Sequence, residues 1–273
     1  MTTPKFCRIA IIADDMKSFT RDVGDMLGIH FVSPSLDTEF PAITVTFGEH
    51  GLEPIQLHEH VPFASHGRLI EVAIDVDSAE ATRKKFRAAG YEPIVNNFLP
   101  APAASEYLFG RDFHGLPLMV CTAGDNETQM RADGPFLELD AAPNPKIGCV
   151  SLIVDSIDKV TADLNQLFGM TFVATDPAGL GERAVVGSHR VKLIEKPNPQ
   201  LLGEFELPLA TIEFVVDDVE VARQRIEAAG YPVRHTRKLN SGGNAYYFGA
   251  TVQRMPLVIY PAHADSEIIG AGQ

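Results

Sequence analysis

Cysteine is scarce in this sequence. The three cysteines, Cys7, Cys121 and Cys149, are an odd number and lie far apart. None belongs to a Cys-x-x-Cys motif or to a Cys/His spacing typical of structural zinc. This pattern argues against a disulfide framework and against a structural zinc site. We therefore expect a reduced, cytoplasmic protein.

Long apolar runs are also missing. The longest runs, such as Ile9–Ala13, are far shorter than the roughly 20 apolar residues with which a helix crosses a bilayer. The N-terminal stretch MTTPKFCRIAIIADD lacks the basic region, the apolar region and the cleavage site of a signal peptide. We expect neither a membrane-spanning segment nor a secretory signal.

Positive charge is in deficit. The chain has 23 Lys and Arg residues against 36 Asp and Glu residues, a formal net charge of −13. Nucleic acids and anionic lipid surfaces are bound through basic surfaces, so we expect no nucleic-acid partner and no membrane partner. Hydrophobic residues make up 45% of the chain and charged residues 22%, which is typical of a globular protein with a substantial core.

A repeated segment indicates how the chain is organised. The stretch FRAAGYEPI at Phe86–Ile94 reappears as IEAAGYPVR at Ile226–Arg234, and the two stretches lie in register at a fixed offset. Around each lies the same pattern: an apolar strand (Glu71–Val76 or Thr211–Val216), an Asp-containing helix cap, a charged helix that ends at glycine, and three further extended segments. A fixed offset marks a duplicated unit, which we predict to be βαβββ.

A second pair of units alternates with the first. Arg8–Asp15 matches Cys149–Ser156, and helices that end at Leu27-Gly28 and Phe168-Gly169 follow them. Short strands are expected after these helices, among them Pro54–Glu59 in the first copy. Four units therefore follow one another, and residues 124–145 form the predicted linker between the two halves.

These units resemble the vicinal oxygen chelate superfamily of glyoxalases, bleomycin-resistance proteins and extradiol dioxygenases. The resemblance rests on the two strand–Asp–helix–AAGY units, on the two helix ends, and on the closing stretch GRDFHGLPLMV at Gly110–Val120. It implies an α+β fold in which four βαβββ modules pair into two open, curved, eight-stranded mixed sheets. We expect a first domain over residues 1–123, a second over 146–262, and a C-terminal tail over 263–273.

The resemblance also implies where a metal would be bound. Members with metal chemistry place His and Glu ligands on the first and last strands of their modules. The aligned first-strand positions here are Arg8, Glu71, Cys149 and Thr211, and the last-strand positions are Gln56, Met119, Lys192 and Val258. None is histidine, so we predict no metal cofactor and expect an ion pair between Arg8 and Glu71 in its place.

An alternative metal site involves QLHEH at Gln56–His60. Side chains alternate along a strand, so Gln56, His58 and His60 would share one face. With Glu71, the two histidines form a competent ligand set for Fe, Mn, Zn or Ni. The surface position expected for His60, beside Pro62, favours the metal-free interpretation.

The function expected from the resemblance is an enzyme that acts on a small organic molecule with a carbonyl or vicinal oxygens. A metal-free protein that binds and sequesters a small molecule is the alternative, and a homodimer is compatible with either. His58, Glu71 and Arg8 are the candidate catalytic residues. The candidate substrate-binding residues are Gln56, Asp75, Met119, Cys149, Lys192, Thr211 and Tyr247.

Overall fold

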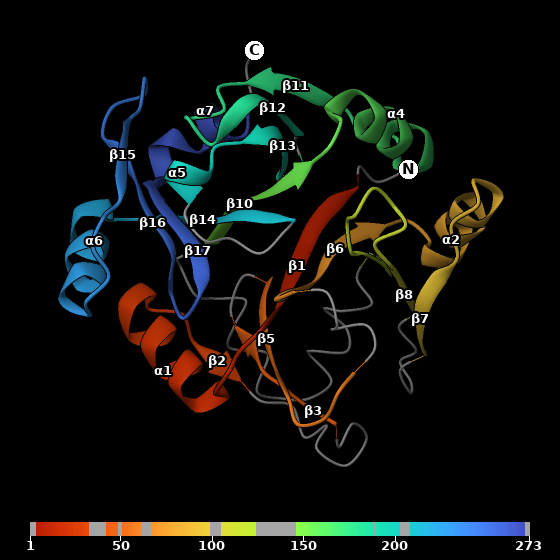
Figure 1. Cartoon of the computed structure of the whole chain (residues 1–273), viewed down its shortest axis with the longest axis horizontal. Coiled ribbons are helices and arrows are strands. Elements are labelled where there is room, and N and C mark those ends of the chain that lie inside the picture. The colour runs from red at the N-terminus through yellow and green to blue at the C-terminus, as the bar shows by residue number, and fades with distance from the viewer. Residues whose placement is uncertain are drawn as a thin grey trace. The chain divides into compact units, whose positions relative to one another are not determined.

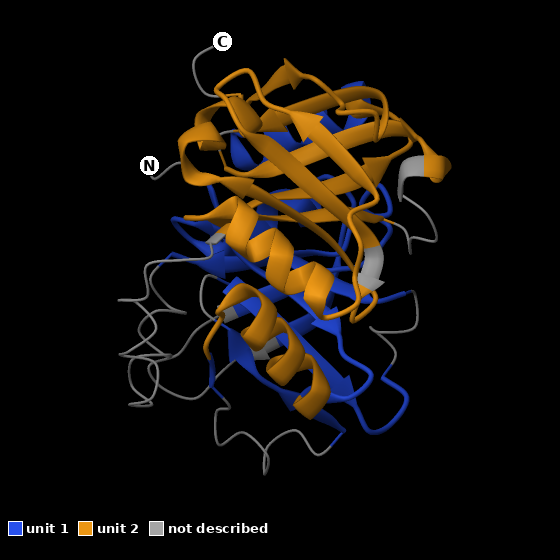
Figure 2. Ribbon diagram, turned by 90° about the vertical axis from the view of Figure 1, so that its left-hand side faces the viewer, with its two compact units in different colours: residues 1–16, 31–142, 158–170 blue, residues 17–30, 143–157, 171–273 orange. Residues whose placement is uncertain are grey.

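The computed structural model describes residues 4–32, 42–48, 51–61, 67–98, 105–123, 146–187, 189–202 and 208–270. The chain divides into two compact units, shown in different colours in Figure 2. Unit 1 comprises residues 1–16, 31–142 and 158–170, and unit 2 comprises residues 17–30, 143–157 and 171–273. The expected linker at 124–145 lies outside the described residues.

Unit 1 is built on a mixed sheet of seven strands in the order β3-β5-β1-β6-β9-β8-β7 (Figure 1). Its strands are β1 (Lys5–Ile12), β3 (Ile43–Val45), β5 (Leu52–Leu57), β6 (Leu69–Val76), β7 (Pro93–Phe98), β8 (Ser105–Phe109) and β9 (Leu118–Thr122). Two further strands, β2 (Phe31–Val32) and β4 (Phe47–Gly48), pair with each other as a separate ribbon. Within the described part of the chain, the first sheet therefore has one strand fewer than the eight expected.

Unit 2 contains an eight-stranded sheet, the number expected, in the order β11-β12-β13-β10-β14-β17-β16-β15. Its strands are β10 (Lys146–Val154), β11 (Phe172–Thr175), β12 (Gly181–Gly187), β13 (Val191–Pro197), β14 (Leu209–Val216), β15 (His235–Lys238), β16 (Asn244–Val252) and β17 (Met255–Pro261). Both sheets are open and curved, and the predicted α+β fold class is confirmed.

The two sheets share one construction. The first strand of each module lies parallel to the last strand of the same module, as β1 does to β5 and β14 does to β17. Two modules meet where their first strands pair antiparallel, β1 with β6 and β10 with β14. The first strands are thus central in each sheet, where side chains from four strands converge.

The helices are short and follow the first strand of each module. They are α1 (Met16–Leu27), α2 (Ala79–Ala88), α4 (Ile157–Phe168) and α6 (Val219–Ala228), together with the single turns α5 (Pro199–Leu202), η5 (Ala262–Ala264) and α7 (Asp265–Ile268). Ser78 and Asp218 cap α2 and α6 by accepting hydrogen bonds from backbone N–H groups of the first turn.

The repeated AAGY sequence ends these two helices. Gly90 and Gly230 have φ angles of 92° and 93°, a left-handed conformation that glycine adopts without steric cost. Two other repeated residues also have a structural role. Glu80 binds Arg83 and accepts a hydrogen bond from Tyr107, and Glu220 makes the same contacts with Arg223 and Tyr246. The repeat therefore ties each helix to its sheet.

The helices α1 and α4 are distributed differently from the strands. Most of α4 belongs to unit 1, where Phe168 packs edge-on against Phe86 of α2 at 5.2 Å. Asp163 of the same helix lies 2.7 Å from His114. Most of α1 belongs to unit 2, where Asp22 accepts a hydrogen bond from Gln253. Each unit thus takes one helix from the other half of the chain, a feature absent from the expected domain boundaries.

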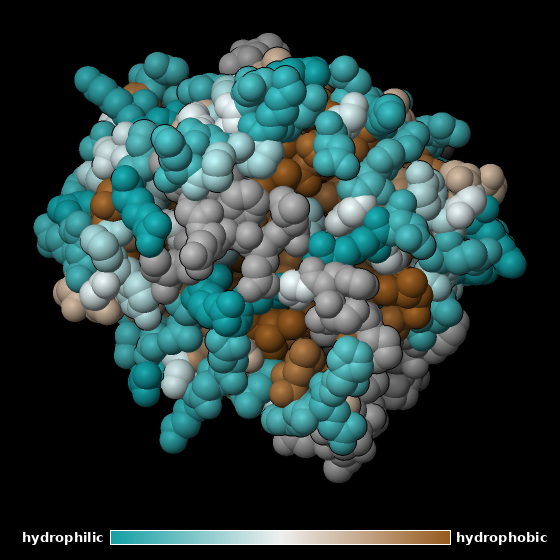
Figure 3. Space-filling model, viewed as in Figure 1, coloured by the Kyte–Doolittle hydropathy of each residue, from teal (hydrophilic) through white to brown (hydrophobic). Residues whose placement is uncertain are grey.

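No described helix is long and apolar enough to cross a membrane. On the face seen in Figure 3, the coloured residues are mainly hydrophilic, and apolar residues form separate small patches. Among the described residues, the larger apolar side chains that are exposed are Ile94, Val173 and Val221, which lie far apart in the sequence. This surface matches the acidic, charged composition.

Candidate functional site

A β-bulge in β1 changes the direction of the side chains at the candidate site. The pairing of β1 with β6 shifts between Phe6 and Arg8, so Cys7 is an extra residue in the register of β1. A bulge interrupts the alternation of side chains along a strand. Phe6 lies in the core, whereas Cys7 packs with residues of β6, β8 and β9, and two of these strands, β6 and β8, also carry partners of Arg8.

The central residue of the site is Arg8, which lies among three glutamates from three other strands. Its Nε is 2.8 Å from Oε2 of Glu53 in β5 and 2.9 Å from Oε1 of Glu71 in β6. Its Nη2 is 2.9 Å from Oε1 of Glu106 in β8. The ion pair expected between Arg8 and Glu71 forms, and two glutamates are added to it.

Burial and mutual repulsion perturb these groups. Burial disfavours the charge of Arg8, but the three carboxylates outweigh burial and raise the pKa of Arg8 well above its ordinary value. Burial also raises the pKa of Glu53 to about 8, despite the opposing attraction of Arg8. Glu71 shifts in the same direction, again mainly because burial raises its pKa.

Glu53 is the least satisfied of the three carboxylates. The Nε–H group of Arg8 donates to Glu71, so Glu53 Oε2 is buried near the guanidinium without a hydrogen bond from the described residues. A buried carboxyl with one unsatisfied oxygen and a near-neutral pKa can hold or release a proton at neutral pH. This combination distinguishes Glu53 from Glu71 and Glu106.

The structure does not bring Gln56 or His58 to this cluster. β5 begins at Leu52, two residues before the expected start at Pro54, and Glu53, Ile55 and Leu57 share the face near Arg8. Gln56 points the other way and accepts a hydrogen bond from the Met16 N–H at the start of α1. His58 is exposed and hydrogen-bonded to Thr44 at 2.7 Å.

The alternative metal ligands are likewise not assembled. His60 is exposed, whereas Glu71 is buried beside Arg8. Among the described residues, the one group of three or more metal-binding side chains that meets is Cys7, Asp75 and Cys121. Of the other predicted residues of unit 1, Asp75 belongs to that group, and Met119 packs with Cys121 and Leu108.

The sequence interpretation missed Glu53 and Glu106. Glu53 corresponds by register to Lys192, because Ala10 pairs with Glu53 as Ser151 pairs with Lys192. Glu53 thus takes the last-strand position that the alignment gave to Gln56. Because side chains alternate along a strand, a strand known to begin at Leu52 would have predicted Glu53 on the face near Arg8 and Gln56 on the opposite face.

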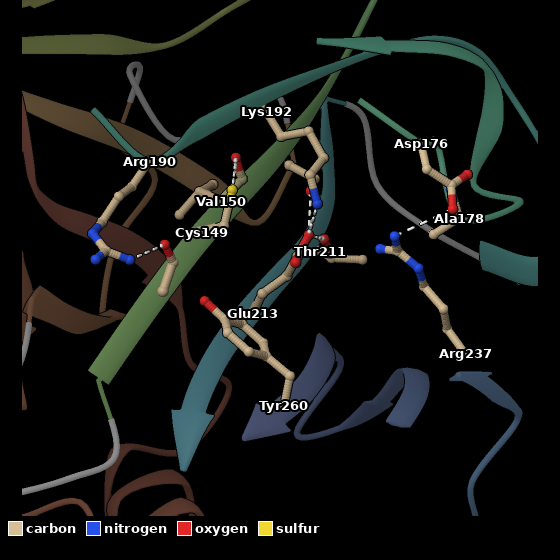
Figure 4. A network of polar contacts seen from close by, with 12 residues as sticks. Cys149, Val150, Asp176, Ala178, Arg190, Lys192, Thr211, Glu213, Arg237 and Tyr260 are labelled. Carbon is tan, nitrogen blue, oxygen red and sulfur yellow. Dashed lines mark hydrogen bonds and ion pairs between the residues drawn. The ribbon is translucent and has the colours of Figure 1, made fainter. Parts of the chain in front are cut away.

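Unit 2 has its own buried polar cluster, centred on Glu213 (Figure 4). Its Oε1 accepts hydrogen bonds from Lys192 Nζ at 2.8 Å, Ser151 Oγ at 2.7 Å and Thr211 Oγ1 at 3.1 Å. Lys192 and Glu213 are almost fully buried, with exposed side-chain fractions of 2% and 0%. The attraction of Glu213 outweighs burial and raises the pKa of Lys192 above its ordinary value. The structure therefore brings the predicted residues Lys192 and Thr211 together.

The same cluster is enclosed by the protein itself. Cys149, Tyr247 and Tyr260 pack with loop residues and with Ala264 and Ile268 near the C-terminus. Burial raises the pKa of Cys149 and of Tyr247 to about 12, which keeps the thiol and the phenol neutral. The Glu213 cluster is thus surrounded by buried side chains of unit 2.

The C-terminal turn closes unit 2 further. Asp265 accepts hydrogen bonds from Tyr260 and from both terminal nitrogens of Arg190, at 2.7 to 2.9 Å. Arg190 also donates to the Gly148 carbonyl oxygen. In unit 1, by contrast, Cys7, Arg8, Ile12 and Leu57 are half-buried rather than buried. Arg8 is thus less completely buried than Lys192, with exposed side-chain fractions of 13% and 2%.

Comparison with known proteins supports the fold assignment. No family model and no curated protein matches this sequence. The structure is similar to the Mn(II)-bound glyoxalase from Novosphingobium aromaticivorans, with 14% identity, a TM-score of 0.63, and coverage of 98% of this chain and 85% of that chain. It is also similar to 2,2',3-trihydroxybiphenyl 1,2-dioxygenase from Sphingomonas wittichii, with 13% identity, a TM-score of 0.66, and coverage of 96% and 91%.

A third similar structure is a mutant of 4-hydroxymandelate synthase from Streptomyces coelicolor. It has 13% identity and a TM-score of 0.66, and the similarity covers 98% of this chain and 97% of that chain. Together with the sheet topology, these similarities show that the chain has the vicinal oxygen chelate fold in its tandem, two-sheet form.

The residues of this chain do not fit the metal that the fold implies. In unit 1 the guanidinium of Arg8 lies among Glu53, Glu71 and Glu106, where a cation would need those carboxylates. In unit 2 the ammonium of Lys192 already neutralises Glu213. In both clusters, buried carboxylates are therefore already paired with a positively charged side chain.

Proposed function

We propose that this chain is an enzyme that moves a proton on a small organic molecule with a carbonyl or vicinal oxygens, at the Arg8 cluster of unit 1. The observation that carries the proposal is Glu53. Its carboxyl group is buried and paired with Arg8, its Oε2 has no hydrogen bond from the residues that the structure describes, and its pKa is raised to about 8. General acid–base catalysis is most efficient when the pKa of the group lies near the working pH.

The neighbouring charges suit this chemistry. In its ionised form Glu53 would accept a proton from the carbon next to a substrate carbonyl. The guanidinium of Arg8, held by Glu71 and Glu106, would stabilise the negative charge that develops on the substrate oxygen. Glu53 would then return the proton to another atom of the same substrate. No step requires a metal ion.

A second function, metal-free binding without turnover, is favoured by the charge balance of the site. Three carboxyl groups surround one guanidinium, so acidic side chains outnumber basic ones in the cluster. Such a site suits a small molecule that is cationic or rich in hydrogen-bond donors. This alternative corresponds to a sequestration-type protein of the same fold.

The deciding experiment follows hydrogen exchange. The full chain would be incubated in D₂O with a panel of small carbonyl compounds and catechols, and deuterium incorporation and product formation would be followed by NMR. We expect deuterium at the carbon next to the carbonyl of at least one compound. Glu53→Gln should abolish the exchange, whereas Glu59→Gln, an exposed glutamate two residues beyond β5, should leave it unchanged.

His58→Ala distinguishes the two candidate bases. Since His58 is exposed and bonded to Thr44, we expect this variant to keep the exchange activity. Loss of exchange in His58→Ala with retention in Glu53→Gln would overturn the proposed role of Glu53. Saturable thermal stabilisation by a compound that shows neither exchange nor product would instead establish the binding function.

A further inference from the structure

Three side chains with metal-binding atoms meet in unit 1, beside the Arg8 cluster. Cys7, Asp75 and Cys121 come from the adjacent strands β1, β6 and β9, and their ligand atoms all lie within 4.8 Å of one another. Two features bring them together: the bulge at Cys7, and the parallel register that places Asp75 opposite Cys121. The sequence separates the two cysteines by most of unit 1.

The two thiols are poorly placed for a disulfide. β6 lies between β1 and β9, and neighbouring strands are about 4.8 Å apart, so the Cα atoms of Cys7 and Cys121 are roughly 9.5 Å apart. A disulfide needs Cα atoms within about 6.8 Å. A metal ion with bonds of about 2.3 Å to each sulfur spans the larger gap without moving the central strand.

The fold does not require cysteine or aspartate at the positions of Cys7, Asp75 and Cys121, because unit 2 has other residues there. Unit 2 repeats the bulge between β10 and β14, and there the corresponding residues are Gly148, Val215 and Tyr260. A Cβ atom on Gly148 would lie 1.7 Å from the hydroxyl oxygen of Tyr260, so the tyrosine side chain fills the space next to the bulge. The same positions are therefore closed by packing in unit 2 and occupied by two thiols and a carboxylate in unit 1.

We infer that Cys7, Asp75 and Cys121 form a binding site for a divalent cation with affinity for thiolates, of which Zn²⁺ is the representative. Two sulfur ligands and one oxygen ligand select zinc-type ions over Mg²⁺ or Ca²⁺, which prefer all-oxygen sites. Glu106 lies next to this group, because the Cys121 thiol donates a hydrogen bond to its Oε1 at 3.7 Å. The site uses none of the residues proposed for proton transfer as its three ligands.

The surroundings suit such a site. Ala73, Val95, Leu108 and Met119 pack around Cys7 and Cys121, and an apolar shell of this kind limits solvent access to a metal. Cys7 and Asp75 are half-buried, so an ion can reach them from solvent, whereas Cys121 forms the buried end of the group. Glu106 also binds Arg8, which connects the group to the proposed catalytic cluster.

The experiment uses Co²⁺ as a spectroscopic probe on the reduced, chelator-treated full chain. Cobalt bound to thiolates gives a sulfur-to-metal charge-transfer absorption that carboxylate sites lack. We expect this absorption to saturate at one Co²⁺ per chain and to disappear when Zn²⁺ is added. Cys7→Ser and Cys121→Ser should each weaken binding by at least about tenfold, while Cys149→Ser, the buried cysteine of unit 2, should bind like the wild type.

A second measurement needs no variant. Zn²⁺ should slow the alkylation of the half-buried Cys7 by iodoacetamide in the wild-type chain, as read by peptide mass spectrometry. Absence of the thiolate absorption, absence of this protection, or an absorption lost only in Cys149→Ser would each overturn the inference. Hydrogen exchange on substrates is read separately, so failure of the metal site leaves the test of Glu53 intact.

Discussion

Glu53 in β5 and Lys192 in β13 hold the same position in the two sheets, one with an acidic and the other with a basic side chain. Each lies beside a central strand, Glu53 opposite Ala10 and Lys192 opposite Ser151. Each is neutralised from another strand, Glu53 by Arg8 and Lys192 by Glu213. One buried position is therefore kept polar in both units, and the sign of its charge decides whether the cluster is left with spare carboxylates.

Removing Arg8 should convert its cluster into a cation site. In Arg8→Ala, the carboxylates of Glu53, Glu71 and Glu106 lose the guanidinium that neutralises them and face one another. Three oxygen ligands suit Mn²⁺, so we expect the variant to bind one Mn²⁺ at concentrations where the wild type binds none. Electron paramagnetic resonance of free Mn²⁺ measures the difference.

Two further variants control this prediction. Arg87→Ala removes an exposed arginine of the same unit and should not create Mn²⁺ binding. Adding Glu71→Gln to Arg8→Ala should abolish the gained binding. If Arg8→Ala is folded by circular dichroism and binds no Mn²⁺, the argument that Arg8 takes the place of a metal fails.

The raised pKa of Glu53 predicts how stability depends on pH. The carboxyl has a folded-state pKa of about 8 against an ordinary value of 4.5, so the folded chain binds more protons than the unfolded chain between these values. This contribution to stability is fully present below pH 4.5 and is lost as the pH rises through about 8. At about 1.4 kcal/mol per pH unit, the contribution is at most about 5 kcal/mol.

Glu53→Gln isolates this effect because the amide is neutral at every pH. We expect the free energy of unfolding of the variant, relative to the wild type, to rise steadily as the pH increases from about 5 to about 9. Urea denaturation at several pH values measures it, with Glu59→Gln as the exposed control. A difference that is constant across this range would show that Glu53 is already ionised at acidic pH.

The parts of the fold that were predictable from sequence are those written as local repeats. Gly90 and Gly230 predict two helix ends, because the residue after a helix often has a left-handed backbone conformation that favours glycine. The module order followed from repeated strands and caps. The separate β2–β4 ribbon and the exchange of α1 and α4 between units had no local signal, because both depend on packing between distant segments.

The candidate site was predictable only where one residue faces its partner across neighbouring strands. Arg8 and Glu71 lie on paired strands, and their ion pair follows from the alignment of modules. Glu53 was not predicted, because the strand expected to start at Pro54 begins at Leu52. Cys7 was separated from Cys121 by a bulge whose position no residue type marks.

The exchange of helices predicts that the two halves depend on each other. A cut within residues 124–145 separates the strands of unit 1 from α4, whose Phe168 covers the buried Phe86. We therefore expect fragments 1–123 and 146–273, produced separately, to show no cooperative thermal transition. Mixing them should restore one. A cooperative transition in either fragment alone would show that the exchanged helices are dispensable.

The buried pair of Lys192 and Glu213 should stabilise unit 2 only as a pair. Lys192→Met leaves Glu213 as an uncompensated buried charge, and we expect a loss of about 3–5 kcal/mol in the free energy of unfolding. In the double variant with Glu213→Gln, the remaining amide still accepts from Ser151 and Thr211, so about 1–3 kcal/mol should be recovered. Urea denaturation of the wild type, the two single variants and the double variant completes the double-mutant cycle. As a control, Lys196→Met, which breaks an exposed pair with Glu182, should leave stability unchanged. If the double variant is no more stable than Lys192→Met, the charge of Glu213 is not what destabilises the single variant, and lost packing of the lysine stem is.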